Sequence, residues 1–321
     1  MSAVRRPLPL LLLSALLLGA CLARGTHGAA ALFTLTDPRG DDHGDGELRY
    51  PLREDMPPGS LDLLSLTAFV EEDGTRFEAT FARPITRPQA GRTVDLAGET
   101  LAQRARHGFY TFNLDVYVDT DRVAGSGRTE TLPGRYLTLE PAGAWEKAIL
   151  VAPRPYEARD TLRALWRKQA REERLRTQGP LGDQQQKALD AEVERQLQER
   201  VFFPTRMRVT GATVEFFVPG AFLGGVARPE WGYAAAVTGA VLETKVNLPA
   251  LFGKDSPQGL MVLPIGPGDS AERFGGGRLG DGAQSPVVDL VVPPGVNQEQ
   301  VLGPSAPAWP VVVPLGPPAA Q

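Results

Sequence analysis

The most constraining feature of the sequence is a run in which apolar and polar side chains alternate strictly. The apolar positions are Tyr110, Phe112, Leu114, Val116 and Val118, and between them lie Thr111, Asn113, Asp115, Tyr117 and Asp119. A period of two places alternate side chains on opposite faces of a β-strand. The run therefore predicts a strand with one buried and one solvated face, and it places Tyr117 on the solvated face.

Shorter strand-like runs recur along the chain, separated by turns such as Leu132-Pro133-Gly134. They cover residues 32–36, 76–81, 148–152, 207–209, 214–218, 233–237 and 287–292. The 321 residues include 35 Gly and 29 Pro, a composition that suits short strands joined by turns. We predict a mostly β protein, an antiparallel β-sandwich in which each sheet has one solvated face.

Residues 157–200 interrupt the strand pattern with a polar segment that carries ten basic and nine acidic side chains. A first helix capped by Asp160 is expected to end at Gln178-Gly179-Pro180. Asp183 and Gln186 resemble a capping box that opens a second helix. The apolar positions are Leu162, Leu165, Trp166, Leu189, Val193 and Leu197. We predict an inserted α-helical hairpin, which is either a solvated spacer packed on the sandwich or an arm that binds a protein partner.

The first residues of the chain predict export. Arg5 and Arg6 precede an apolar stretch at 8–18 that has signal-peptide proportions and is too short to span a bilayer. The stretch ends in Leu18-Gly19-Ala20-Cys21, which resembles the lipobox of bacterial lipoproteins. We predict a signal peptide at 1–20. The alternative is an ordinary secretory signal that is cut near Ala29-Ala30-Ala31.

Lipidation of Cys21 would place the protein on a membrane of the bacterial cell envelope, behind a tether at 21–31, without a spanning helix. Cys21 is the only cysteine, so no intramolecular disulfide is available. The net charge of -4 argues against a nucleic-acid partner, because such binders carry a strongly basic face. Residues 304–321 contain six prolines and Trp309 and predict an extended tail, which is a spacer or a ligand for a partner.

The densest group of chemically active side chains is an acidic, glycine-rich segment at 37–46. Its carboxylates belong to Asp37, Asp41, Asp42 and Asp45. Ca²⁺ takes several oxygen ligands at about 2.3–2.6 Å, and a tight acidic loop offers them. An acidic turn that caps its own backbone amides explains the same composition equally well.

A second acidic turn is Asp119-Thr120-Asp121, with Glu130 eleven residues after Asp119. Val123 and Ala124 occupy positions where an EF-hand needs a ligand and a glycine, so the EF-hand is rejected. We interpret this segment as a hairpin turn.

Several short motifs follow one another along the chain in a specific order. They are the acidic stretch at 37–46, Y-P at 50–51, G-S-L-D-L at 59–63, F-N-L-D-V-Y-V-D at 112–119, T-L-P-G at 131–134, W-E-K-A-I at 145–149, W-G-Y-A at 231–234, F-G-G-G at 274–277, P-V-V-D-L at 286–290 and Q-E-Q-V-L at 298–302. Together they resemble the glucodextranase C-terminal module family. The resemblance covers residues 32–303, with the insertion at 157–200 and the tail outside it.

The resemblance implies a DOMON-like β-sandwich that is regarded as a carbohydrate-binding or cell-surface-attachment module. If the closing strand lies near the first, the recurring carboxylates meet around one ion. We therefore expect a structural Ca²⁺ held by Asp37, Asp41 or Asp42, with help from Asp62 or Asp289.

Sugar rings stack on aromatic side chains, and polar groups orient their hydroxyls. Tyr117 and Trp145 are the candidate ligand-binding residues, whereas Trp231 and Tyr233 are expected to belong to the core. These features favour a non-catalytic, envelope-anchored module that binds a glycan or cell-surface polysaccharide. The alternative is a structural adaptor lipoprotein that holds a protein partner through the helical insertion or the tail.

Signatures of common hydrolases are missing from the sequence, which has no H-E-x-x-H, no G-x-S-x-G and no cysteine besides Cys21. A pair of glycosidase carboxylates is set by tertiary structure, so the sequence leaves that alternative open. Haem needs axial ligands, and the three histidines and four methionines offer no supported pair. We expect a binding protein without catalytic activity.

Overall fold

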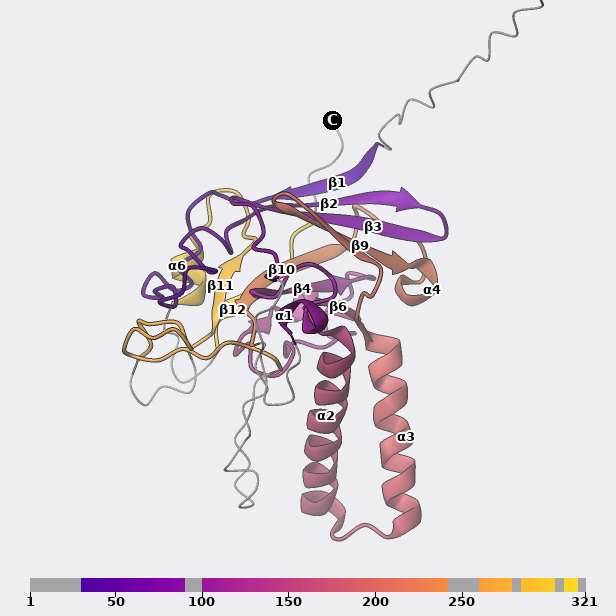
Figure 1. Ribbon diagram of the computed structural model, residues 1–321. Coiled ribbons are helices and arrows are strands. Elements are labelled where there is room, and N and C mark those ends of the chain that lie inside the picture. Colours follow the sequence, from indigo (N-terminus) through magenta and orange to yellow (C-terminus); the bar gives the residue numbers. More distant parts are fainter. Residues whose placement is uncertain (1–29, 90–99, 242–259, 279–283, 304–308, 317–321) are drawn as a thin grey trace, which may run out of the picture.

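The computed structural model describes residues 30–89, 100–241, 260–278, 284–303 and 309–316 (Figure 1). The predicted signal peptide, Cys21 and nearly all of the predicted tether lie outside these ranges. None of the described helices is long and apolar enough to cross a membrane.

The first sheet has five strands in the order β1-β2-β3-β9-β8, and all neighbours are antiparallel. The strands are β1 (Ala31–Thr36), β2 (Leu63–Glu71), β3 (Gly74–Phe81), β8 (Met207–Thr210) and β9 (Thr213–Pro219). Their side chains alternate between buried and partly exposed: in β3, Phe77, Ala79 and Phe81 are buried, and the two residues between them are partly exposed. This sheet has the single solvated face that the sequence predicts.

The second sheet also has five strands, in the order β11-β10-β4-β6-β7. The strands are β4 (Phe112–Asp119), β6 (Lys147–Val151), β7 (Val201–Phe202), β10 (Gly232–Gly239) and β11 (Val287–Leu290). Only the β6–β7 pair is parallel within this sheet. The fold is therefore mostly β, and its strands are largely antiparallel.

The main hydrophobic core lies between the two sheets. Leu114, Val116 and Val118 of β4 pack there against side chains of the first sheet, including Phe77 and Phe216. The strict alternation of the sequence produces this arrangement, because it gives β4 a continuous apolar face.

The prediction that the second sheet has a solvated face is wrong, since every residue of β4 and β10 is buried. A second apolar cluster covers the outer face and includes Tyr117, Trp145, Trp166 and Leu197. Polar side chains of β4 find partners on this covered face: Asp115 forms an ion pair with the guanidinium of Arg135, and the Tyr117 hydroxyl donates to Asp115. The second sheet therefore lies between two apolar layers.

The inserted hairpin consists of α2 (Pro155–Gln178) and α3 (Asp183–Arg200), which project from the sandwich (Figure 1). The first helix starts earlier than the sequence predicts, at Pro155, because proline suits the first position of a helix. The second helix is capped by Gly182 and not by Asp183, since the Gly182 N–H donates to Gln185 Oε1 at 3.0 Å.

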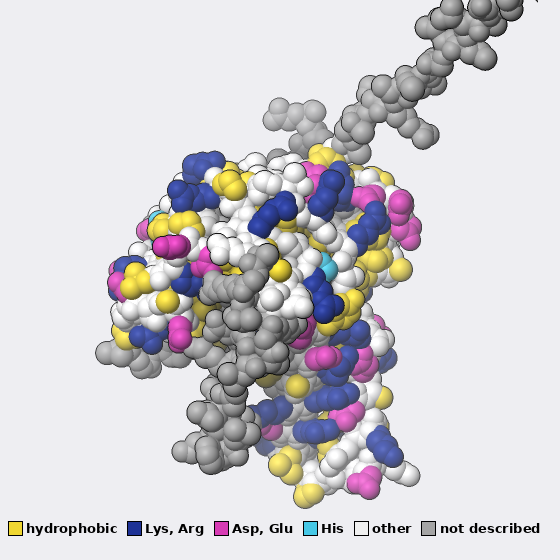
Figure 2. All heavy atoms as spheres, viewed as in Figure 1, with side chains coloured by type: hydrophobic (Ala, Val, Ile, Leu, Met, Phe, Trp, Pro, Cys, Tyr) yellow, Lys and Arg dark blue, Asp and Glu magenta, His cyan; other side chains and the backbone are white. Residues whose placement is uncertain are grey.

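The inner part of the hairpin belongs to the second apolar cluster, through Ala158, Leu162 and Trp166 of α2 and Val193 and Leu197 of α3. Basic and acidic side chains are intermixed over the exposed part (Figure 2). Ion pairs join the two helices, such as Arg163 Nε to Glu194 Oε2 at 2.6 Å. The hairpin is thus anchored at its base and polar along its length.

Short elements complete the structure. They are α1 (Leu101–Arg104), β5 (Thr138–Leu139), η1 (Pro141–Gly143), α4 (Gly220–Leu223), α6 (Gln298–Leu302) and β12 (Val311–Val312). The predicted extended tail returns to the body, because β12 pairs in parallel with β5. A Cβ atom at Gly143 would lie 2.6 Å from Pro314 Cδ, so this close approach requires glycine.

Candidate functional site

The acidic loop that follows β1 meets two distant segments of the chain, the start of β2 and the strand β11. The Val292 N–H, just after β11, donates to Asp37 Oδ1 at 3.2 Å. The Leu63 N–H, at the start of β2, donates to Asp289 Oδ2 of β11. The closing strand therefore lies near the first strand, which is the arrangement that the predicted carboxylate site needs.

Carboxylates gather where these segments meet. Oxygens of Asp37, Asp41 and Asp289 all lie within 4.8 Å of one another. Asp62 is adjacent and accepts a hydrogen bond from the Gly40 N–H at 2.9 Å. Each of these four side chains has one buried oxygen without a hydrogen-bond partner among the described residues: Asp37 Oδ2, Asp41 Oδ1, Asp62 Oδ1 and Asp289 Oδ1.

The pKa values of these carboxyl groups reflect their crowding. Burial, followed by the charge of Asp41, raises the pKa of Asp37 to about 7. Burial and the charge of Asp37 raise the pKa of Asp289 well above its ordinary value. Burial also raises the pKa values of Asp41 and Asp62. Such a group must either hold protons or bind a cation, because buried like charges repel.

The remaining carboxylates of the loop have protein partners and do not join this cluster. Asp42 is 2% exposed and accepts hydrogen bonds from the Tyr50 hydroxyl and from the Gly59 N–H. Asp45 pairs with the guanidinium of Arg278 at 2.7 Å. The structure thus separates Asp42 from the other predicted ligands and gives it the role of bracing the Tyr50-Pro51 segment.

Gln298 holds the loop in place, a role that the sequence interpretation did not assign. Its Oε1 accepts from the Leu290 N–H at 2.6 Å, and its Nε2 donates to the Asp41 carbonyl at 2.6 Å. Gln298 is 2% exposed, so its amide is a buried link between β11 and the loop. The motif at 298–302 contained this residue, but no spacing rule connects it to Asp41.

The two predicted glycan-binding residues lie inside the protein. Tyr117 and Trp145 are each 1% exposed, and their rings pack together at a centroid distance of 5.6 Å. The Tyr117 hydroxyl donates to Asp115, and the Trp145 indole N–H donates to the Glu130 carbonyl. Neither ring has a free face for a sugar. Trp231 and Tyr233 belong to the main core, in line with their predicted positions.

The second acidic turn also collects carboxylates, since Asp119, Asp121 and Glu146 approach within 4.8 Å. Here the oxygens serve the turn itself: Asp119 Oδ1 accepts from the Arg122 N–H at 2.7 Å, and Glu146 Oε2 accepts from the Thr120 N–H at 2.8 Å. The Arg122 guanidinium lies 3.7 Å from Asp119. These contacts cap a turn, but it is not the tight hairpin turn that the sequence predicts, because the next strand along the chain that pairs with β4 is β6, which begins only at Lys147. Asp119 Oδ2 is buried and has no hydrogen-bond partner among the described residues.

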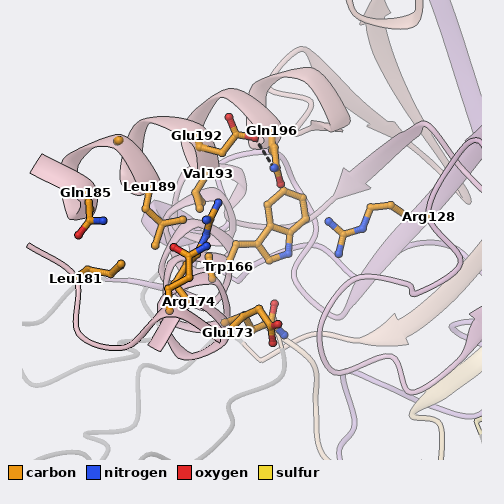
Figure 3. A pocket seen from close by; sticks show the side chains of 14 residues that line it. Arg128, Trp166, Glu173, Arg174, Leu181, Gln185, Leu189, Glu192, Val193 and Gln196 are labelled. Carbon is orange, nitrogen blue, oxygen red and sulfur yellow. Dashed lines mark hydrogen bonds between the residues drawn. The ribbon is translucent and has the colours of Figure 1, made fainter. Parts of the chain in front are cut away.

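A groove of about 670 Å³ runs between the two helices of the hairpin (Figure 3). Trp166 lies at its inner end, with the Arg128 guanidinium 5.0 Å from the centre of the ring. Leu189 and Val193 contribute apolar side chains from α3, and most of the other lining residues are polar or small. The lining of the groove is therefore mixed, with apolar side chains beside polar ones.

Comparison with known proteins identifies one family. The model of a family described as the SLH-like C-terminal binding module of glucodextranase matches residues 32–313. The match confirms the resemblance and extends beyond residue 303, so it takes in β12. No curated protein matches the chain.

Proposed function

We propose a binding function from one premise: the chain belongs to the family of the SLH-like C-terminal binding module of glucodextranase. This family is described as a binding module and not as a catalytic domain. Our proposal is that the protein is a non-catalytic module that attaches to a glycan or cell-surface polysaccharide of the bacterial envelope, and that a lipid on Cys21 anchors it. The family match over residues 32–313 is the observation that carries the proposal.

A Ca²⁺ ion bound by Asp37, Asp41 and Asp289, with Asp62 beside it, is the second part of the proposal. The four buried oxygens without partners support it, because buried carboxylates are normally paired, protonated or bound to a metal. Oxygen-only ligands suit Ca²⁺. The ion would join the loop after β1 to the beginning of β2 and to β11, so its role would be to stabilise the fold.

Retention on polysaccharide tests the binding proposal. The module without Cys21 is incubated with insoluble starch, cross-linked dextran and purified bacterial cell-wall material, with Ca²⁺ or with EDTA. Saturable retention on one of these materials is the expected result. Absence of retention on all of them would overturn the glycan proposal and favour the adaptor alternative, in which the hairpin groove holds a protein partner.

Thermal unfolding tests the calcium proposal separately. Ca²⁺ is expected to raise the Tm of the unmutated protein, and Asp41→Asn is expected to abolish that rise, since it removes one ligand charge. Asp42→Asn is the matched control: its amide oxygen can still accept from the Tyr50 hydroxyl and the Gly59 N–H, so this variant should keep the rise in Tm that Ca²⁺ produces. No rise in the unmutated protein would remove the ion from the proposal.

A further inference from the structure

The returning tail presents a row of exposed apolar side chains on the surface. Trp309, Val311 and Val313 are 37%, 54% and 51% exposed, whereas Val312 between them is 2% exposed. The alternation follows from the pairing of β12 with β5, in which Val311 lies opposite Thr138 and Val312 opposite Leu139. The Thr138 N–H donates to the Pro310 carbonyl at 2.9 Å, which fixes the start of the row.

A polar row lies beside the apolar one. Tyr136, Thr138 and Glu140 are partly exposed and alternate with the buried Leu137 and Leu139. Residues that lie opposite each other in a sheet share a face, so Thr138 and Val311 point to the same side. We call the surface formed by Trp309, Val311, Val313, Tyr136, Thr138 and Glu140 the Trp309 face.

The aromatic rings of this face are held in fixed positions. Tyr136 and Trp309 pack with ring centroids 5.8 Å apart and an interplanar angle of 60°. Tyr136 has a φ of 50°, a backbone conformation that a tyrosine adopts only when its surroundings impose it. The preceding Arg135 is fixed at two points, because its side chain is buried against Asp115 and its carbonyl accepts from Ser285 Oγ at 2.7 Å.

We propose that the Trp309 face is the carbohydrate-binding surface of this protein. The indole of Trp309, a residue that is 37% exposed, offers an apolar platform for the flat face of a pyranose. The Thr138 hydroxyl donates to the Pro310 carbonyl at 3.3 Å and can still accept from a sugar hydroxyl. The neighbouring Tyr136 hydroxyl can donate or accept, and the carboxylate of Glu140 can accept. The proposal rests on the glycan-binding function and assigns it to particular side chains.

Trp309 is by far the most exposed of the four tryptophans. Trp145, Trp166 and Trp231 are 1%, 6% and 7% exposed. The chain contains four tryptophans, all within the described residues. Quenching of tryptophan fluorescence by acrylamide therefore reports mainly on Trp309, and a sugar stacked on this ring must reduce the quenching.

The test combines this signal with retention on polysaccharide. Trp309→Ala is compared with Trp309→Phe and with Tyr156→Ala, in which a tyrosine that is 68% exposed at the start of α2 is removed as the control. The probes are insoluble starch, cross-linked dextran and bacterial cell-wall material for retention, and soluble fragments of the retaining polymer for fluorescence. We expect Trp309→Ala to weaken retention about tenfold or more, Trp309→Phe to weaken it less, and Tyr156→Ala to leave it unchanged.

The outcomes separate this inference from the proposed function. If the unmutated protein is retained but Trp309→Ala, with an unchanged Tm, is retained equally well, the Trp309 face is not the binding surface. If Trp309→Ala lowers the Tm, retention is judged from Trp309→Phe, and the quenching experiment is done on the unmutated protein. Bound sugar must then protect Trp309 from acrylamide. Unaltered quenching at saturation overturns the inference. If the unmutated protein binds none of the probes, the proposed function itself fails.

Discussion

Single residues decide which carboxylates of the acidic loop remain open to a ligand. Asp42 is satisfied by Tyr50 and Gly59, and Asp45 by Arg278, so both are neutralised or solvated by protein groups. Asp37 and Asp41 instead face Asp289. The sequence predicted that the carboxylates of this loop form a cation site. It could not show which of them have protein partners instead, because that depends on which backbone N–H group each side chain reaches.

The raised pKa of Asp37 predicts how the metal-free protein responds to pH. Its pKa is about 7 in the folded state against 3.8 for the ordinary carboxyl group, so between these values only the folded state holds the proton. That contribution to stability is complete below the lower pKa and is lost as the pH rises through about 7. Urea unfolding in EDTA should therefore give a larger free energy of unfolding at about pH 5 than at about pH 7.5.

Asp37→Asn is the control for this pH response, since an amide does not titrate. Its free energy of unfolding should change less between the two pH values than that of the unmutated protein. Saturating Ca²⁺ should oppose the trend, because the ion binds the deprotonated carboxylates and its stabilising effect grows as the pH rises. A chelated protein whose stability is greater at the higher pH, and equally so in Asp37→Asn, would contradict the assignment.

Arg135 and Asp115 form a fully buried ion pair, with Arg135 Nε 2.6 Å from Asp115 Oδ2. Arg135 also donates to the Leu260 carbonyl at 2.7 Å. Arg135→Ala leaves a buried, uncompensated carboxylate, which we expect to lower the free energy of unfolding by about 3–5 kcal/mol in urea titrations.

The exposed pair of Arg208 and Glu215 provides the comparison for Arg135→Ala. Arg208 is 72% exposed, so Arg208→Ala should cost less than about 1 kcal/mol. Equal losses in the two variants would show that burial does not set the energy of the inner pair.

At the scale of elements, strong periodicity was predictable and short or covered elements were not. The strict alternation of β4 and the polar composition of 157–200 correctly predicted a strand and a helical hairpin. The two-residue strands β5, β7 and β12 carry too few residues for a period to be visible. The burial of Tyr117 was missed because local alternation cannot reveal that distant segments cover the other face of β4.

The burial of the hairpin residues predicts which part of the hairpin the sandwich needs for its stability. Trp166 and Leu197 belong to the outer apolar cluster, whereas the tip is exposed. Replacing residues 171–188 by a short Gly/Ser turn should therefore leave a folded module, lower its Tm by only a few degrees and preserve polysaccharide retention. Removing all of 157–200 should unfold or strongly destabilise the protein, because it exposes the cluster.

Differential scanning calorimetry and retention on the polysaccharide that holds the unmutated protein check the hairpin prediction together. Capture of a protein partner should disappear in the shortened variant if the groove is its binding site. Loss of polysaccharide retention in a shortened variant that remains folded would instead place the glycan site on the hairpin and contradict the Trp309 face.

At the scale of the whole molecule, order along the chain carried more information than any single motif. Each motif is short, but their succession identified the family over 32–303, and the match at 32–313 extends it through β12. The sequence predicted that Trp309 belongs to an extended tail. The proline-rich sequence gives no sign of the two-residue strand β12, which pairs with β5. The ligand surface that we propose depends on this contact between distant segments.

The position of β1 gives the lipid-anchor proposal a geometric consequence. β1 begins at Ala31, ten residues after Cys21, so an extended tether would reach roughly 35 Å from the membrane surface. In Figure 1 the start of β1 and the tip of the hairpin lie on opposite sides of the body. An anchor at Cys21 would therefore keep the sandwich close to the membrane surface.

Cys21→Ser tests this arrangement in cells that export the full chain. The variant should move from the membrane fraction to the soluble fraction and lose metabolic labelling by a radioactive fatty acid, because a serine at this position cannot form the thioether to the lipid. Its purified module should retain the same Tm and the same retention on polysaccharide, since Cys21 precedes β1 and the sites described above. A variant that remains fully in the membrane fraction after washing with high salt would show that something other than the lipid holds the protein there.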